Sequence, residues 1–182
     1  MHAVVQALQS SGLRPTLGGS GLLHAYGLIN AVRDWDVLVD TDVAAVQTAL
    51  DEAGLLWTDA ADRSGRYATS ARLLLTMGDA EIDLMVEFAI WPEGASHDGP
   101  PVRIPSIPSG TWNGIPLGSL EAWLAAYRLM RRPNKPDRIH EYLATSGVNH
   151  DHLERMLAEP LPEHMRRELM DLRLRGNESP AR

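Results

Sequence analysis

Apolar and polar positions alternate with two different periods along the chain. Apolar residues at helical spacing predict one helix over residues 2–11 and another from Thr41 or Asp42 to Gly54. Apolar runs bounded by turn residues predict strands over 13–17, 32–40, 55–58, 67–77 and 80–88, with a two-residue hairpin turn before the last. Strands alternating with helices indicate an α/β fold, with a small mixed sheet flanked by helices.

The second half of the chain has a different pattern. Prolines and glycines interrupt residues 91–116, which predicts a loop with short extended pieces that serves as a boundary or a lid. Apolar spacing then predicts helices over 119–132, 137–144, 151–157 and 162–174, and disorder from Gly176 onward. We therefore expect a catalytic domain over residues 1–115 and a helical region over 116–182.

The predicted strand over 32–40 carries two acidic residues, Asp34 and Asp36. Alternate side chains on a strand share a face, so both carboxylates point one way while Trp35 points the other. Two adjacent carboxylates repel each other unless a cation neutralises them, and carboxylate oxygens are preferred ligands of hard divalent metals such as Mg²⁺. The pair is either half of a metal site or two solvated acids at a strand edge.

A glycine turn precedes this strand at Gly18, Gly19 and Ser20, where a strand leads into a helix. Glycines permit close approach of the backbone, and a helix N-terminus offers unpaired N–H groups to an anion. Alone, the turn is a simple strand-to-helix connection. Beside a metal site, it predicts phosphate binding and hence a nucleoside triphosphate site.

A third acid follows on the predicted strand over 80–88. Asp83 shares one face of that strand with Glu81 and Glu87, which is more negative charge than a core requires. Gly-Gly-Ser, thirteen residues, Asp-x-Asp and a later strand acid together resemble the nucleotidyltransferase superfamily, which includes polymerase beta and the antibiotic nucleotidyltransferases. Asp83 matches the family's third acid, and Glu81 and Glu87 are possible substitutes for it.

The resemblance implies an enzyme that moves a nucleoside monophosphate from a nucleoside triphosphate, such as ATP, to a hydroxyl of an acceptor. Asp34, Asp36 and Asp83 would be the catalytic residues and would hold two Mg²⁺ ions, while Gly18, Gly19 and Ser20 would bind the nucleotide. The acceptor, a small molecule, an RNA or a protein, is left open. Two alternatives are a catalytically silent module that binds nucleotide or protein, and the toxin component of a toxin–antitoxin or abortive-infection pair that modifies tRNA or protein.

Composition narrows the chemistry further. The chain has no cysteine, so disulfides, thiolate metal sites and a cysteine nucleophile are excluded. A net charge of -7 argues against a surface that is basic throughout, although a local basic patch remains possible. No apolar run is long enough to span a bilayer and no basic stretch leads into an apolar segment at the N-terminus, so we expect a cytoplasmic protein without membrane contact.

A basic turn separates the first two helices of the predicted helical region and contains Arg131, Arg132, Lys135 and Asp137. It loosely resembles a basic-Lys-Asp turn in small members of the same superfamily, although Pro136 here separates Lys135 from Asp137. The turn could bind triphosphate or an RNA backbone, or it could be a solvated helix end. The pair His150 and His152 lacks a third metal ligand, so we expect surface histidines there.

Overall fold

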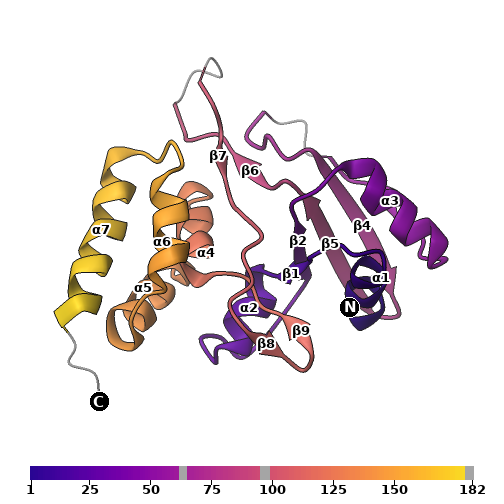
Figure 1. Ribbon diagram of the computed structural model, residues 1–182, viewed down its shortest axis with the longest axis horizontal. Coiled ribbons are helices and arrows are strands. Elements are labelled where there is room, and N and C mark those ends of the chain that lie inside the picture. The colour runs from indigo at the N-terminus through magenta and orange to yellow at the C-terminus, as the bar shows by residue number, and fades with distance from the viewer. Residues whose placement is uncertain (62–64, 95–98, 179–182) are drawn as a thin grey trace.

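The computed structural model describes residues 1–61, 65–94 and 99–178, and a five-stranded sheet lies at its centre (Figure 1). The sheet has the strand order β1-β2-β5-β4-β3, in which β2 and β5 are parallel and the other neighbours are antiparallel. Its strands are β1 (Thr16–Leu17), β2 (Trp35–Val39), β3 (Thr58–Asp59), β4 (Ala71–Met77) and β5 (Ala80–Val86). The predicted small mixed sheet flanked by helices is confirmed.

The two pairings made by β5 fix which side chains share a face. The turn at Gly78 and Asp79 joins β4 to β5 and sets Met77 opposite Ala80, as the hairpin pattern predicts. The parallel pairing with β2 sets Asp36 opposite Asp83. Since paired residues point to the same side of a sheet, both carboxylates lie on one face.

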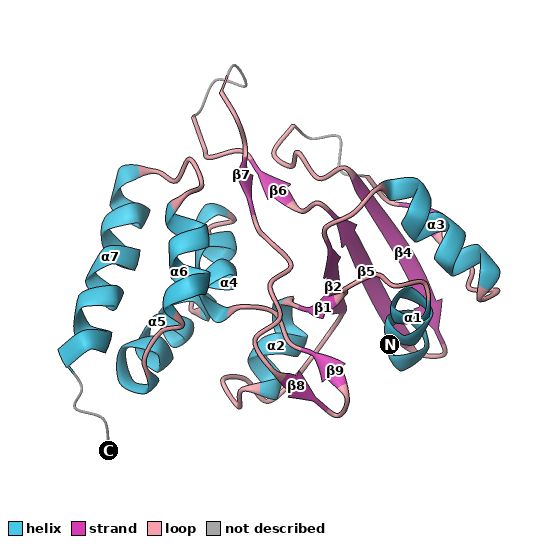
Figure 2. Cartoon of the chain, in the orientation of Figure 1, coloured by secondary structure: helices cyan, strands magenta, loops and turns pink. Residues whose placement is uncertain are grey.

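The opposite face of the sheet is the apolar core of the first half. Ile82, Leu84 and Val86 of β5 are fully buried there. Two helices lie on this side, α1 (His2–Ser10) and α3 (Val43–Glu52) (Figure 2). The Asp42 side chain caps α3 by accepting hydrogen bonds from two backbone N–H groups of its first turn.

The middle of the chain is mostly loop, as its prolines predict. Helix α2 (Gly19–Ala25) lies earlier in the chain, between β1 and β2. Beyond the sheet, the extended pieces form two short antiparallel pairs. These are β6 (Ala89–Ile90) with β7 (Val102–Arg103) and β8 (Thr111–Trp112) with β9 (Ile115–Pro116).

Four helices make up the rest of the described chain and pack together beside the sheet (Figure 2). They are α4 (Leu120–Leu129), α5 (Lys135–Ser146), α6 (His150–Leu157) and α7 (Glu163–Glu178). The expectation of disorder from Gly176 is wrong for residues 176–178, which continue α7, whereas residues 179–182 lie outside the described part. Within the described residues, no helix combines the length and the apolar character that crossing a membrane requires.

A buried carboxylate ties the helices to one another. Glu121 in α4 is 2% exposed, and its two oxygens accept hydrogen bonds from the Ser119 hydroxyl at 2.7 Å and the Asn149 backbone N–H at 2.7 Å. His152 Nδ1 lies 3.7 Å from the same carboxylate, and His152 is buried at 6% exposure. The expectation of a surface histidine is therefore wrong for His152, because α6 packs this side of its first turn against α4.

We expect Glu121→Ala to lower the free energy of unfolding by about 3 kcal/mol, because it leaves buried donors without an acceptor. Urea unfolding followed by circular dichroism measures the change. Glu141→Ala, on the exposed face of α5, is the control and should change stability by less than about 0.5 kcal/mol. Equal losses in the two variants would contradict this role for Glu121.

Candidate active site

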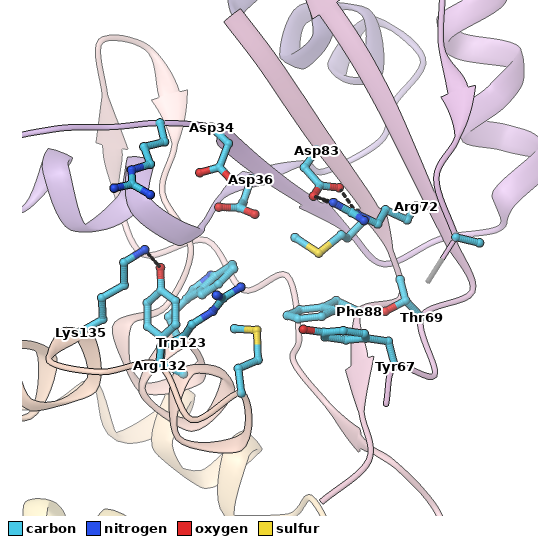
Figure 3. Close-up of a pocket in the computed structure, with 15 residues that line it drawn as sticks. Asp34, Asp36, Tyr67, Thr69, Arg72, Asp83, Phe88, Trp123, Arg132 and Lys135 are labelled. Atoms are coloured by element: carbon cyan, nitrogen blue, oxygen red, sulfur yellow. Dashed lines mark hydrogen bonds and ion pairs between the residues drawn. The ribbon is translucent and has the colours of Figure 1, made fainter. Parts of the chain in front are cut away.

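A pocket of about 430 Å³ lies between the sheet and the helices α4 and α5 (Figure 3). Its volume is in the range of small-molecule and cofactor sites. Acidic, basic and aromatic side chains from both parts of the chain line it. They are Arg33, Asp34, Asp36, Ala61, Tyr67, Thr69, Arg72, Asp83, Met85, Phe88, Trp123, Tyr127, Met130, Arg132 and Lys135.

The acidic side of the pocket consists of the three predicted acids. Asp36 lies on β2 and Asp83 on the neighbouring β5. Asp34 directly precedes Trp35, the first residue of β2. Figure 3 shows the Asp34 and Asp36 carboxylates side by side, with Asp83 on the adjacent strand. All three predicted residues thus reach one pocket.

Neither proposed substitute for Asp83 lines the pocket. Glu81 is exposed opposite Thr76 near the hairpin turn. Glu87 follows the end of β5 with a left-handed φ of 49°, and it binds the Ser70 hydroxyl and the Arg103 guanidinium. Of the acids on this strand, Asp83 alone faces the site.

The surroundings of Asp36 disfavour its charged form. Burial, followed by the negative charges of Asp34 and Asp83, raises the pKa of Asp36 from 3.8 to about 7. Lys135 and a backbone hydrogen bond from Ser20 oppose that shift. Burial and repulsion together outweigh these compensating contacts, so the negative charge of Asp36 is unfavourable in the protein alone.

The glycine turn packs tightly against Asp36. Gly19 has a left-handed φ of 53°, and a Cβ built on it would lie 1.6 Å from Asp36 Oδ2. Ser20 is 4% exposed, and its hydroxyl donates to the Asp34 backbone carbonyl at 3.0 Å and to Asp34 Oδ1 at 3.3 Å. Gly18, Gly19 and Ser20 are not among the pocket-lining residues, and in this structure they hold the two acids in place.

Asp83 is bound by an arginine that the sequence interpretation did not include. Arg72 Nε lies 2.9 Å from both Asp83 oxygens, and Arg72 Nη2 lies 2.6 Å from Oδ2. Arg72 lies on β4 opposite Met85, diagonal to Asp83 across the hairpin. Cross-strand diagonal neighbours are within reach of long side chains, so the register itself brings this pair together.

The basic side of the pocket comes from the turn between α4 and α5 and from the start of α5. Lys135 and Arg132 line the pocket, and Lys135 lies 5.0 Å from the centre of the Tyr127 ring. The other two residues of this turn are engaged elsewhere: Asp137 accepts from Arg128 at 2.8 Å, and Arg131 pairs with Glu93. Lys135 and Arg132 thus line the pocket, whereas Asp137 joins α5 to α4 and Arg131 ties the turn to the loop after β6.

Aromatic rings form the remaining wall. Phe88 stacks on Tyr67 with ring centres 6.2 Å apart, and it also contacts Trp123 at 6.0 Å. Burial, followed by the nearby charge of Asp36, raises the pKa of Tyr127. Together these rings give the pocket an apolar side next to its two charged sides.

The donor set suits a hard divalent cation. Three carboxylates reach one pocket, and both burial and the neighbouring negative charges disfavour the charged form of Asp36, which an added cation would stabilise. Among the described residues, no three His, Cys, Asp or Glu side chains are already gathered as a set of metal ligands. Asp83 is turned toward Arg72, so the prediction that the three carboxylates share metal ions stays a prediction.

Gly19→Ala should destabilise the protein by about 3 kcal/mol or more, because the added methyl group would overlap Asp36 and the residue keeps a left-handed φ. Gly27→Ala is a matched control, because Gly27 also has a positive φ but open space around its Cβ position. It should lose only about 1 kcal/mol. Urea unfolding distinguishes the two, and similar losses would show that Gly19 does not need to be close to Asp36.

The raised pKa of Asp36 predicts a pH dependence in metal-free buffer. The folded protein binds this proton more tightly than the unfolded chain, so the free energy of unfolding should fall as pH rises from 3.8 to about 7 and then level off. Asp36→Asn should remove that part of the fall and exceed wild type in stability above pH 7. Urea unfolding across this range, with the exposed Asp79→Asn as control, measures it. An unchanged slope in Asp36→Asn would contradict the assignment.

Comparison with known proteins finds similarity in structure rather than in sequence. No family model and no curated protein matches the chain. A Thermotoga maritima protein assigned as a nucleotidyltransferase superposes with a TM-score of 0.56 at 18% identity, over 78% of this chain and 89% of its own. ANT(2'')-Ia in complex with adenylyl-2''-tobramycin covers 99% of this chain and 96% of its own, at 15% identity and a TM-score of 0.49. By its architecture, this chain has a nucleotidyltransferase-like fold.

Proposed function

We propose that the protein is a metal-dependent nucleotidyltransferase that moves a nucleoside monophosphate from a nucleoside triphosphate to a hydroxyl of an acceptor. The observation that carries the proposal is the set of Asp34, Asp36 and Asp83 on the acidic side of a pocket whose opposite side is basic. The nucleotidyltransferase-like fold is consistent with it. Carboxylates for a metal and cations for phosphate are the two halves of a triphosphate site.

Each side of the pocket has a role in this proposal. Lys135 and Arg132 hold the triphosphate by charge and hydrogen bonds. The Gly18–Ser20 turn is proposed to join them, with the Ser20 hydroxyl exchanging Asp34 for a phosphate oxygen. The aromatic wall at Tyr67 and Phe88 offers flat apolar surfaces on which a base or an acceptor ring can rest.

The reaction exchanges one phosphorus–oxygen bond for another. The acceptor hydroxyl oxygen bonds to the α-phosphorus, the bond from that phosphorus to the pyrophosphate oxygen breaks, and the hydroxyl proton passes to a carboxylate or to water. Bound divalent cations, with Mg²⁺ proposed at two positions, would neutralise the triphosphate and the leaving pyrophosphate. Asp34 and Asp36 are proposed to hold both positions and Asp83 the one nearer the acceptor.

A second candidate is a catalytically silent module that binds nucleotide without transferring it. The contact between Arg72 and both oxygens of Asp83 favours this alternative, because it occupies the third acid. The basic side and the aromatic wall would still serve binding. The two candidates differ in whether Asp83 takes part in chemistry.

Labelled nucleoside triphosphates with Mg²⁺, screened against small hydroxyl compounds, RNA and proteins, test for transfer. We expect Asp36→Asn to lower transfer by about 100-fold or more, equivalent to about 2.7 kcal/mol of transition-state stabilisation. Asp83→Asn should abolish transfer yet keep most of the nucleotide-dependent rise in melting temperature, because Asp34 and Asp36 still support binding. Asp34→Asn should lose both.

The exposed Asp79→Asn is the control and should transfer at the wild-type rate. A nucleotide-dependent rise in melting temperature without transfer to any acceptor would support the silent module. Wild-type transfer by Asp83→Asn would refute the three-acid mechanism. An unchanged melting temperature at millimolar nucleotide, together with no transfer, would reject both candidates.

A further inference from the structure

Arg72 and Asp83 make the closest charge pair on the acidic side of the pocket. Three hydrogen bonds of 2.9, 2.9 and 2.6 Å join the guanidinium to the two carboxylate oxygens. The Asp83 side chain is 12% exposed, and that of Arg72 is 41% exposed. A carboxylate this buried requires a partner, and Arg72 provides the positive charge.

Asp34 and Asp36 are stabilised by other groups. The Ser20 hydroxyl donates to Asp34, and the Ser20 backbone opposes the raised pKa of Asp36. Among the hydrogen bonds and ion pairs of the described residues, neither acid forms one with a guanidinium. Asp83 is therefore the one whose oxygens already face a permanent cation, because an arginine does not lose its proton in a protein.

A divalent cation at this site would compete with Arg72. Both seek the same two oxygens, and two positive groups at one carboxylate repel each other at short range. Arg72 Nη1 also donates a hydrogen bond of 3.4 Å to the Ala60 backbone carbonyl. This second acceptor could hold the guanidinium near the pocket after its contacts with Asp83 break.

We propose that Arg72 is a positioning residue that acts as the built-in counter-cation of Asp83, and that a divalent cation must displace it to bind there. This inference rests on the proposed function, since it assigns Asp83 to the same metal site. It makes Arg72 a determinant of metal affinity in the absence of nucleotide. It also makes the occupied Asp83 a resting arrangement rather than a sign of a silent module.

Binding of Mn²⁺, used as a paramagnetic substitute for Mg²⁺, tests the proposal without any transfer assay. Free Mn²⁺ is counted by electron paramagnetic resonance in nucleotide-free protein. We expect Arg72→Gln to lower the Mn²⁺ dissociation constant by about tenfold or more, because the competing cation is gone. Arg72→Lys keeps the charge but loses the forked contact, so it should fall between wild type and Arg72→Gln.

Two further variants test whether a gain in Mn²⁺ affinity is specific to Arg72 and depends on Asp83. Arg103→Gln removes an exposed arginine whose 3.1 Å ion pair with Glu87 lies outside the pocket, and it should leave Mn²⁺ binding within about twofold of wild type. The double variant Arg72→Gln with Asp83→Asn should lose the gain. If Arg72→Gln does not fold, as judged by circular dichroism, the Arg72→Lys comparison decides.

If Arg72 had a purely structural role, Arg72→Gln should bind Mn²⁺ more weakly than wild type, because the loss of a structural contact disturbs the site. Mn²⁺ binding by Arg72→Gln that is unchanged or weaker than in wild type would overturn the proposal. Tighter binding in that variant, without transfer in the wild type, would reject the enzyme and keep the counter-cation. Transfer in the wild type, without tighter Mn²⁺ binding in Arg72→Gln, would support the enzyme and reject the counter-cation role of Arg72.

Discussion

The parallel pairing of β2 with β5 sets Asp36 directly opposite Asp83, and this placement of like charges is the constraint on which the site depends. Burial, followed by the negative charges of Asp34 and Asp83, raises the pKa of Asp36 to about 7. A sheet face with this much negative charge is unfavourable without positive charge nearby. Two cations and one set of hydrogen-bond donors compensate for it from three directions.

A different element of the fold provides each of these groups. Strand β4 supplies Arg72 to Asp83, the first residue of α5 supplies the Lys135 charge near Asp36, and the start of α2 supplies the Ser20 hydroxyl and backbone. These contacts hold the acids in place but leave Asp36 with a raised pKa. The compensation is therefore partial, which is the condition under which an added cation binds favourably.

Sequence patterns predicted the mixed sheet and the faces of its strands, because strand alternation and turn type depend on nearby residues. That Asp83 would join Asp34 and Asp36 was implied by the family resemblance instead. Arg72 was missed although the two-residue turn at Gly78 and Asp79 fixes the register, and counting back from it places Arg72 diagonal to Asp83. His152 was misassigned because its burial depends on how α6 meets α4, a contact between distant segments. The local pattern of Ser20 also gave no sign that its hydroxyl would bind Asp34.

The helical part completes the pocket rather than standing apart from it. The Gly118 N–H donates to the Leu17 carbonyl at 2.9 Å, and an Arg66 guanidinium donates to the Leu129 carbonyl at 2.7 Å, so both ends of α4 are fastened to the first half. With both ends of α4 fastened in this way, the acids of the sheet and Lys135 line the same pocket. Because a charge interaction weakens with distance, the contacts that join the two parts also matter for the electrostatics of the site.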